Sequence, residues 1–349
     1  MSSVLFILKR KEDFNAVVDS SVGLSTGLYN SASFVNTMLN DLGINSKIEV
    51  VADNNCIDRV VTLHRPTHVI IEALWVTPEK FSVLQRLHPS VQWIIRVHSE
   101  MPFMAGEGMA MDWLGDYSSF KNVVLAINAP RMFREIEFFI RHRNNLTAEQ
   151  SAKKVIYLPN FYPQEFKHKV LDKSKDTIDI GCFGAIRPLK NHLLQAFAAI
   201  EFANNIGKNL NFHVNAGRIE MNGQPAINNL KGLFSQLYDR GHRLVNHTWA
   251  PREGFLELCG EMDLCLQVSF SETFNIVGAD VISQGVPLVS CKEVPWSLIG
   301  RCDPTDSKSI IDGLSLAYRF PQLNVDINQY GLKRYTDKVS KIWTKYFKE

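Results

Sequence analysis

The α/β character of the chain is clearest in residues 271–290, which read SETFNIVGADVISQGVPLVS. The apolar run Leu264–Val268 predicts a buried strand just before this segment, and a helical pattern follows the loop that begins it. The loop carries the carboxylate of Glu272, and the helix carries that of Asp280 eight residues later. In open α/β sheets, ligands bind at the carboxyl ends of strands, where the N–H groups of helix N-termini hold phosphate. The segment therefore predicts a site for a phosphorylated ligand with hydroxyl groups, which a nucleotide sugar fits.

The length and composition are those of a globular protein with two domains. At 349 residues, the chain can fill two domains of about 150 residues each. Charged residues make up 21%, hydrophobic residues 45%, and the formal net charge is +2, so only a local basic patch could bind nucleic acid. The six cysteines contain no C-x-x-C pair, which favours reduced core residues. The first apolar run, Val4–Leu8, is too short for a signal peptide or a membrane span, so we expect a cytoplasmic chain with no transmembrane segment.

Strand-like and helical patterns alternate along the chain, which predicts parallel sheets covered by helices. Six strand-like runs fall between Val4 and Leu158, and five fall between Ile178 and Ser290. A stretch rich in proline, aromatic residues and lysine separates the two groups. We therefore expect a first domain, an interdomain crossing, a second domain and a final amphipathic segment, at residues 1–163, 164–176, 177–325 and 326–349 respectively.

A basic turn forms a second group of candidate binding residues. Residues 180–191 read IGCFGAIRPLKN, so a strand runs into Gly184, a short loop carries Arg187 and Lys190, and a helix begins near Asn191. Two cations and a helix N-terminus at the end of a strand suit a diphosphate. A surface turn with solvated basic residues is the alternative, because glycine-rich turns are common in α/β sheets.

Together, the two segments resemble the donor-binding half of the family-4 retaining glycosyltransferases, which have the GT-B fold. In that family, a Gly-Arg-loop-Lys-Gly segment and a Glu-Gly-Phe-Gly…Glu-Ala segment hold the nucleotide sugar. The second segment here reads Glu-Thr-Phe-Asn from Glu272 and ends with Asp280, so the spacing between the acids is kept. Segments of the first half are also similar to the family's strand ending in Val-His-Asp, its Ile-Pro-Asn-Gly segment and its glycine-rich loop; they are Trp93–Glu100, Val155–Asn160 and Ser25–Leu28.

The resemblance implies the GT-B fold, in which two Rossmann-like α/β domains face each other across a cleft and the C-terminal helix packs back on the first domain. The first domain would bind the acceptor and the second would bind the donor. His98 and Glu272 would be the catalytic residues next to the anomeric carbon, with a purely structural His98 as the alternative. Asp280 would hold the ribose, and Lys190 would neutralise the charge that develops on the leaving diphosphate. The donor-binding residues that the resemblance implies are Gly27, Gly184, Arg187, Lys190, Trp249, Thr273, Phe274, Asn275 and Asp280.

The sequence also departs from the family pattern. Ala185 stands where the family has its arginine, so Arg187 would have to reach the phosphate from two residues later. Thr273 and Asn275 replace two glycines, which changes the sugar pocket, and Asp280 is one methylene shorter than the family's glutamate. These changes retain a nucleotide site and leave the identity of the sugar open.

The helical pattern of residues 131–143 marks the acceptor side. Arg131 and Arg134 belong to a basic face that is either solvated or a platform for an anionic acceptor, such as a lipid headgroup or nucleic acid. Glu100 is a further carboxylate on this side, and its position in a loop predicts that it is solvated.

The resemblance therefore implies a transferase that moves a hexosyl or pentosyl group from a nucleoside-diphosphate sugar, UDP-linked, to an acceptor hydroxyl with retention of configuration. No metal and no other cofactor is expected, because cations and helix N-termini can neutralise the diphosphate and the histidines lack metal-ligand spacing. The acceptor is a glycan, a lipid or modified DNA, and a bacteriophage-type enzyme acting on hydroxymethylated pyrimidines is the specific DNA case. A nucleotide-sugar epimerase and a non-catalytic nucleotide-sugar-binding protein are the rival interpretations.

Overall fold

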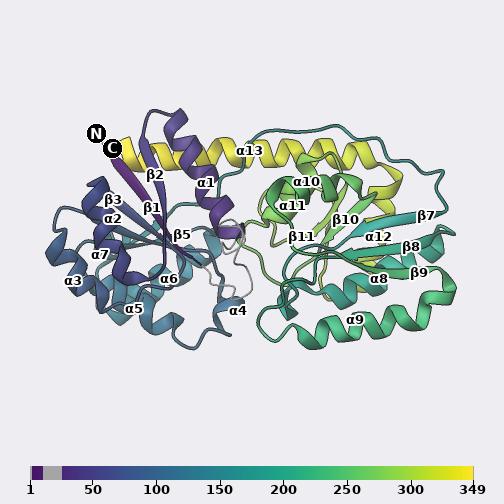
Figure 1. Ribbon diagram of the computed structural model, residues 1–349, viewed down its shortest axis with the longest axis horizontal. Helices are drawn as coiled ribbons and strands as arrows, with labels where there is room; N and C mark the ends of the chain where they lie inside the picture. Colours follow the sequence, from purple (N-terminus) through teal and green to yellow (C-terminus); the bar gives the residue numbers. More distant parts are fainter. Residues whose placement is uncertain (1, 11–25, 349) are drawn as a thin grey trace. The chain divides into compact units, whose positions relative to one another are not determined.

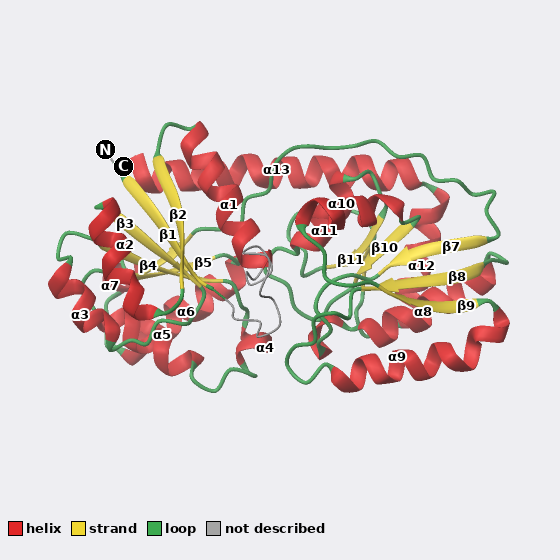
Figure 2. Ribbon diagram, in the orientation of Figure 1, coloured by secondary structure: helices red, strands yellow, loops and turns green. Residues whose placement is uncertain are grey.

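The computed structural model describes residues 2–10 and 26–348 (Figure 1). The chain divides into two compact units: unit 1 comprises Met1–Pro163 with Thr336–Glu349, and unit 2 comprises Gln164–Tyr335. Each unit contains one six-stranded sheet, and helices connect the strands (Figure 2). The predicted α/β class is therefore confirmed.

The sheet of unit 1 is parallel and has the strand order β2-β1-β3-β4-β5-β6. Its inner strands are largely apolar because helices cover both faces, as in β5, where every residue is buried, whereas the edge strand β2 alternates exposed polar residues with buried ones. All six strands coincide with the six apolar runs of the first half of the sequence. They are β1 (Ser3–Lys9), β2 (Asn45–Val51), β3 (His68–Glu72), β4 (Gln92–Val97), β5 (Val123–Ile127) and β6 (Val155–Tyr157).

The helices of unit 1 lie between these strands in the chain. They are α1 (Thr26–Asp41), α2 (Ile57–His64), α3 (Lys80–Leu87), α4 (Met101–Met104), α5 (Ala110–Ser119), α6 (Pro130–Arg143) and α7 (Ala148–Ala152). Because α1 begins at Thr26, Gly27 lies in the first turn of a helix and not in a glycine-rich loop. Ser25, where the predicted loop begins, lies outside the described residues.

The sheet of unit 2 has the order β12-β11-β10-β7-β8-β9, which is the strand order of dinucleotide-binding Rossmann sheets. Its strands are β7 (Thr177–Gly181), β8 (Asn209–Val214), β9 (His242–Asn246), β10 (Leu264–Gln267), β11 (Leu288–Cys291) and β12 (Arg301–Cys302). The strand order reverses between β7 and β10, and crevices for ligands form at such a switch point. The two-residue β12 has no counterpart among the predicted strands, because two residues give no periodicity. The helices are α8 (His192–Asn205), α9 (Gln224–Leu237), α10 (Arg252–Glu261), α11 (Ile276–Ser283) and α12 (Ser307–Arg319).

The last helix, α13 (Pro321–Lys348), continues from unit 2 into unit 1, where its final turns contribute to the core. Trp343 is fully buried, donates its Nε1–H to the carbonyl of Pro159 at 2.8 Å, and lies 6.2 Å from the ring of Phe6. The helix begins at Pro321, five residues before the expected start at residue 326. None of the helices within residues 26–348 has the length and apolarity needed to cross a membrane.

Candidate functional site

The switch point of the unit 2 sheet brings the two predicted donor-binding segments together. The loop after β7 carries Lys190, and the loop after β10 carries Glu272. The Lys190 Nζ donates a hydrogen bond to Glu272 Oε1 at 2.5 Å, and both side chains are largely buried, at 10% and 7% exposure. A cation and a carboxylate separated by 82 positions in sequence thus form one pair at the edge where the fold favours ligand binding.

Backbone hydrogen bonds and amide side chains hold these loops in place. Gly184 has φ +116°, which favours glycine, and its N–H donates to Asn215 Oδ1 at 2.7 Å. Asn191, the N-cap residue that precedes α8, has φ +57°, and its Nδ2 donates to the carbonyls of Val268 and Pro304. The basic turn is therefore tied to the loop that carries the acid, which fixes the position of the ion pair.

The residues at the start of α11 contribute mainly to structure. Asn275 has φ +63°, and its Oδ1 accepts the N–H of Gly278 at 2.7 Å as the N-cap of the helix. Phe274 is 1% exposed and packs near Trp296, so its side chain belongs to the core. Thr273 is half-buried in the same loop. Asn275 is thus a cap that the helix uses.

Asp280 lies in α11 and is 3% exposed. Arg252, the first residue of α10, donates from Nη1 to Asp280 Oδ1 at 2.7 Å. Sequence reasoning missed Arg252, because the two residues are 28 positions apart and only the packing of α10 beside α11 joins them. The acid assigned to the ribose therefore has a guanidinium partner.

A second cluster of unit 2 joins the loops after β7, β8 and β9. Glu220 accepts a hydrogen bond from Arg187 Nη1 at 3.4 Å and forms an ion pair with Arg218 Nη2 at 2.5 Å. The Arg218 guanidinium lies over the ring of Trp249, 5.3 Å from the ring centroid, which is within the reach of about 6 Å for such contacts. Trp249 is 37% exposed. The structure thus places Arg187 and Trp249 in one cluster through Arg218 and Glu220, neither of which the motifs indicated.

In unit 1, the carboxyl ends of β3 and β4 place a buried charged network around His98. The His98 Nε2 makes a short hydrogen bond to Glu72, and Arg96 Nη1 donates to the other oxygen of this carboxylate at 3.0 Å. Arg96 also donates from Nη2 to Asn160 Oδ1 at 2.6 Å. Asn128 Nδ2 lies 3.4 Å from His98 Nδ1. Glu72 and Arg96 have fully buried side chains, and His98 is 13% exposed.

The network sets the charge of its members. Burial lowers the pKa of His98 below its ordinary value, although the Glu72 carboxylate acts in the opposite direction. Burial would raise the pKa of Glu72, but the charge of Arg96 and the hydrogen bonds to His98 and Arg96 hold it below its ordinary value. At neutral pH the imidazole is therefore neutral and donates from Nε2, and Nδ1 carries a lone pair.

Glu72 is the main residue of this unit that the motifs missed. The signal for it was a carboxylate ending the buried strand His68–Glu72, because a charge in such a position needs a partner. The following residue, Ala73, has φ +69°, a conformation that alanine rarely adopts. Such strain is tolerated only where the surroundings fix the backbone, and here the Ala73 N–H donates to the Arg96 carbonyl.

The residues predicted from the sequence to lie on the acceptor side are partly brought together. Glu100 is 4% exposed and pairs closely with Arg131, so the prediction that it is solvated is wrong. The reason is that α4 and the start of α6 enclose the loop, which sequence periodicity does not show. Arg134 is exposed on α6, one turn after Arg131.

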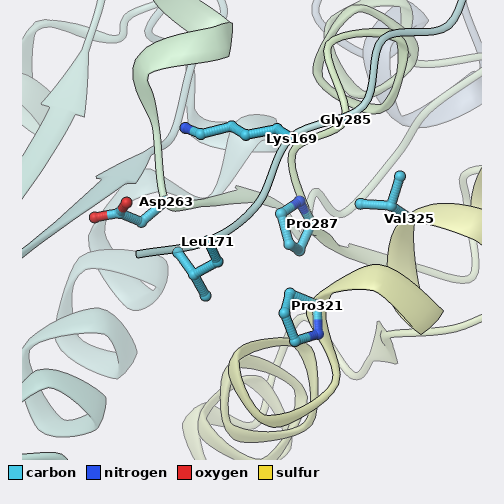
Figure 3. Close-up of a pocket in the computed structure, with 7 residues that line it drawn as sticks. All are labelled: Lys169, Leu171, Asp263, Gly285, Pro287, Pro321 and Val325. Atoms are coloured by element: carbon cyan, nitrogen blue, oxygen red, sulfur yellow. The ribbon is translucent and has the colours of Figure 1, made fainter. Parts of the chain in front are cut away.

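Two other features of the described residues bear on ligands. A cavity beside Lys169, Asp263, Pro287 and Val325 in unit 2 has a volume of about 10 Å³, which is room for one water molecule and not for a nucleotide (Figure 3). Within residues 2–10 and 26–348, no three His, Cys, Asp or Glu side chains are grouped so that they could hold a metal ion.

Comparison with known proteins identifies the fold. No family model matches the sequence, and no curated protein matches it. The structure is similar to that of trehalose 6-phosphate synthase from Burkholderia multivorans, with a TM-score of 0.69, 11% identity, and coverage of 99% of this chain and 96% of that one. It is also similar to sucrose-phosphate synthase from Thermosynechococcus elongatus (TM-score 0.66, 11% identity, 99% and 98% coverage) and to Anabaena HepE in complex with UDP and glucose (TM-score 0.63, 12% identity, 99% and 98% coverage). The chain therefore has the α/β fold of the GT-B glycosyltransferases along nearly its whole length.

Proposed function

We propose that the chain is a glycosyltransferase that moves a sugar from a UDP-linked donor to an acceptor hydroxyl. The observation that carries this proposal is the Lys190–Glu272 pair at the switch point of a Rossmann-order sheet. Its support from comparison is that similar structures include a UDP-forming synthase and a protein bound to UDP and glucose. Unit 2 would hold the donor, and unit 1 would hold the acceptor.

In this proposal, the donor diphosphate replaces Glu272 as the partner of Lys190. The N-terminus of α8, which begins at His192 directly after the basic turn, adds free N–H groups to the same anion. As the sugar leaves, negative charge grows on the diphosphate, and a fixed cation stabilises that charge without any reorganisation. Glu272, released from Lys190, accepts hydrogen bonds from the sugar hydroxyls. No metal ion is required for these steps.

Arg252 and Asp280 would recognise the ribose. The carboxylate accepts hydrogen bonds from ribose hydroxyls, and the guanidinium orients it and compensates for the missing methylene relative to glutamate. Trp249 and Arg218 offer a flat, partly exposed surface for the base.

The neutral imidazole of His98 would bind a substrate hydroxyl in unit 1, and Glu72 would fix its tautomer. We propose retention of anomeric configuration, on the similarity of residues 272–280 to the retaining family. The anomeric configuration of the product, read from NMR coupling constants, tests this point directly.

The test of function is release of nucleoside diphosphate from a panel of nucleotide sugars, with glycan, lipid and hydroxymethylated DNA acceptors. UDP-glucose should give the strongest release, and Glu272→Ala should abolish it while the protein stays folded. Lys308→Ala is the matched control, because it removes one member of an exposed ion pair on α12 and should leave turnover unchanged. Binding of UDP without turnover of any donor would favour a non-catalytic binding protein, and an epimerised donor without transfer would favour an epimerase.

Arg252→Ala should weaken UDP binding about 10-fold, because it removes the partner that orients Asp280 at the ribose. Isothermal titration with UDP and with 2′-deoxy-UDP measures this effect. The expected loss is larger for UDP than for the deoxy analogue. An equal loss for both nucleotides would mean that Arg252 acts on the fold and not on the ribose.

A further inference from the structure

The end of α13 concentrates positive charge. Residues 333–348 carry six of the 38 lysines and arginines of the chain and one of its 36 acids, so the remaining residues have 32 cations against 35 acids. One sixteen-residue helical segment thus makes an otherwise slightly acidic chain basic. The positive charge is therefore concentrated in one local segment, which the near-neutral net charge of the whole chain does not reveal.

Most of this charge lies on one narrow face of the helix. Arg334, Lys338, Lys341, Lys345 and Lys348 are spaced by four and three residues in alternation, and all are exposed. At 100° per residue they fall within an arc of about 80°, and at 1.5 Å per residue they extend over about 21 Å. We call these five residues the α13 stripe. Asp337 is the one acid of residues 333–348, and it lies at the edge of the arc.

Two ordinary explanations do not account for the α13 stripe. Cations in the last turn of a helix complement its dipole, which explains Lys345 and Lys348, but Arg334, Lys338 and Lys341 precede the last turn. Ion pairing with the protein surface is the other explanation. The structure shows no salt bridge for Arg334, Lys338, Lys341 or Lys348 with any described residue.

The opposite face of the helix is occupied by the protein core. Val339, Trp343 and Phe347 are at most 5% exposed. A helix that lies in a membrane interface buries its apolar face in the lipid, but here that face is already covered. Within residues 333–348, no large hydrophobic side chain is exposed. The α13 stripe therefore offers a line of charge without an apolar anchor, which suits a linear polyanion better than a bilayer.

We infer that the α13 stripe binds the phosphodiester backbone of a nucleic acid duplex. Its length of about 21 Å matches about six base pairs at 3.4 Å each. The contact is independent of base sequence, because lysines that reach phosphates position a duplex without reading it. This inference does not rest on the proposed transferase activity. The α13 stripe contains none of the residues proposed to bind the donor.

The test is fluorescence anisotropy of the full chain with a labelled 20-base-pair duplex between 50 and 200 mM salt. Four phosphate contacts, from Arg334, Lys338, Lys341 and Lys348, predict a slope of log K against log salt of about −3.6. The triple variant Lys338→Ala, Lys341→Ala, Lys348→Ala should weaken binding about 10- to 100-fold and reduce the slope by about 3, because three contacts are lost. Alanine is the best helix former, so α13 should persist.

The matched control is the triple variant Lys121→Ala, Lys231→Ala, Lys292→Ala, which removes the same charge from exposed positions elsewhere. It should bind the duplex within about 2-fold of the unaltered chain. Equal weakening by both triple variants would mean that only net charge matters and would overturn the inference. Binding to anionic phosphatidylglycerol vesicles without binding to the duplex would assign the stripe to a membrane and overturn it as well. UDP affinity, measured in parallel, should be unchanged in both variants, so a failure here is distinct from a failure of the transferase proposal.

Discussion

Glu72→Ala should lower the free energy of unfolding by about 3–5 kcal/mol, which is the usual cost of removing one partner from a buried ion pair. The substitution leaves the Arg96 guanidinium, whose side chain is fully buried, without the carboxylate that it contacts at 3.0 Å. It also removes the acceptor of the His98 N–H. The remaining contacts of Arg96, with Asn160 and with the Trp343 ring, do not neutralise its charge. Urea denaturation of unit 1, followed by near-ultraviolet circular dichroism, measures the loss.

The control for this substitution is Glu49→Ala. Glu49 pairs with His64, but its side chain is 33% exposed, and ion pairs of this kind contribute about 0–1 kcal/mol. Glu72→Gln, which keeps the volume and one acceptor oxygen, should fall between the two. A loss below about 1 kcal/mol for Glu72→Ala would show that solvent reaches Arg96 and that the network is not structural.

The same network makes the free energy of unfolding depend on pH. The pKa of His98 and that of Glu72 are both lower in the folded chain than their ordinary values, so below about pH 6.5 the unfolded state binds more protons than the folded state. Because the folded chain favours neutral His98, this residue contributes its full stability above the unfolded-state pKa of histidine. That contribution is lost as the pH falls below this value. The contribution of Glu72 is lost at still lower pH, below about 4.3. The free energy of unfolding, measured from pH 8 down to pH 4, should therefore decrease as the pH decreases. In His98→Gln, the free energy of unfolding should change less between pH 6.5 and pH 5 than in the unaltered chain.

Lys190→Ala should reduce kcat for sugar transfer about 10²- to 10³-fold, the range for removal of one preorganised group that stabilises developing charge. The loss should appear mainly in kcat, because the charge on the leaving diphosphate grows in the transition state. The N-terminus of α8 would still bind the ground-state diphosphate, so KM for the donor should change less.

Lys190→Arg separates charge from geometry. It keeps the cation, but the planar guanidinium does not fit the place of an ammonium that makes a 2.5 Å contact with Glu272. Partial recovery of kcat is therefore expected, together with an altered KM. Steady-state kinetics with UDP-glucose measure both constants. Turnover of Lys190→Ala equal to that of the Lys308→Ala control would remove Lys190 from the chemistry.

The alternation of apolar runs and helical patterns determined the fold class and the positions of the strands, because a parallel sheet covered on both faces needs continuous apolar strands such as Val123–Ile127. Spacing within one segment determined that Glu272 and Asp280 flank a single helix start. Both are local properties, which a sequence records directly. The short strand Arg301–Cys302 was not predicted, because two residues are too few to show a periodic pattern.

Only the tertiary structure decided which charges meet. Glu72 and His98 come from the carboxyl ends of adjacent strands, Lys190 and Glu272 from loops on either side of a switch point, and Arg252 and Asp280 from neighbouring helices. Each pair is joined across 26 to 82 positions, and the sequence between them carries no mark of the contact. Burial holds the charged groups of these pairs in fixed positions and makes each depend on its partner. Burial itself depends on what covers a residue and not on the residue, so only the packed chain determines it.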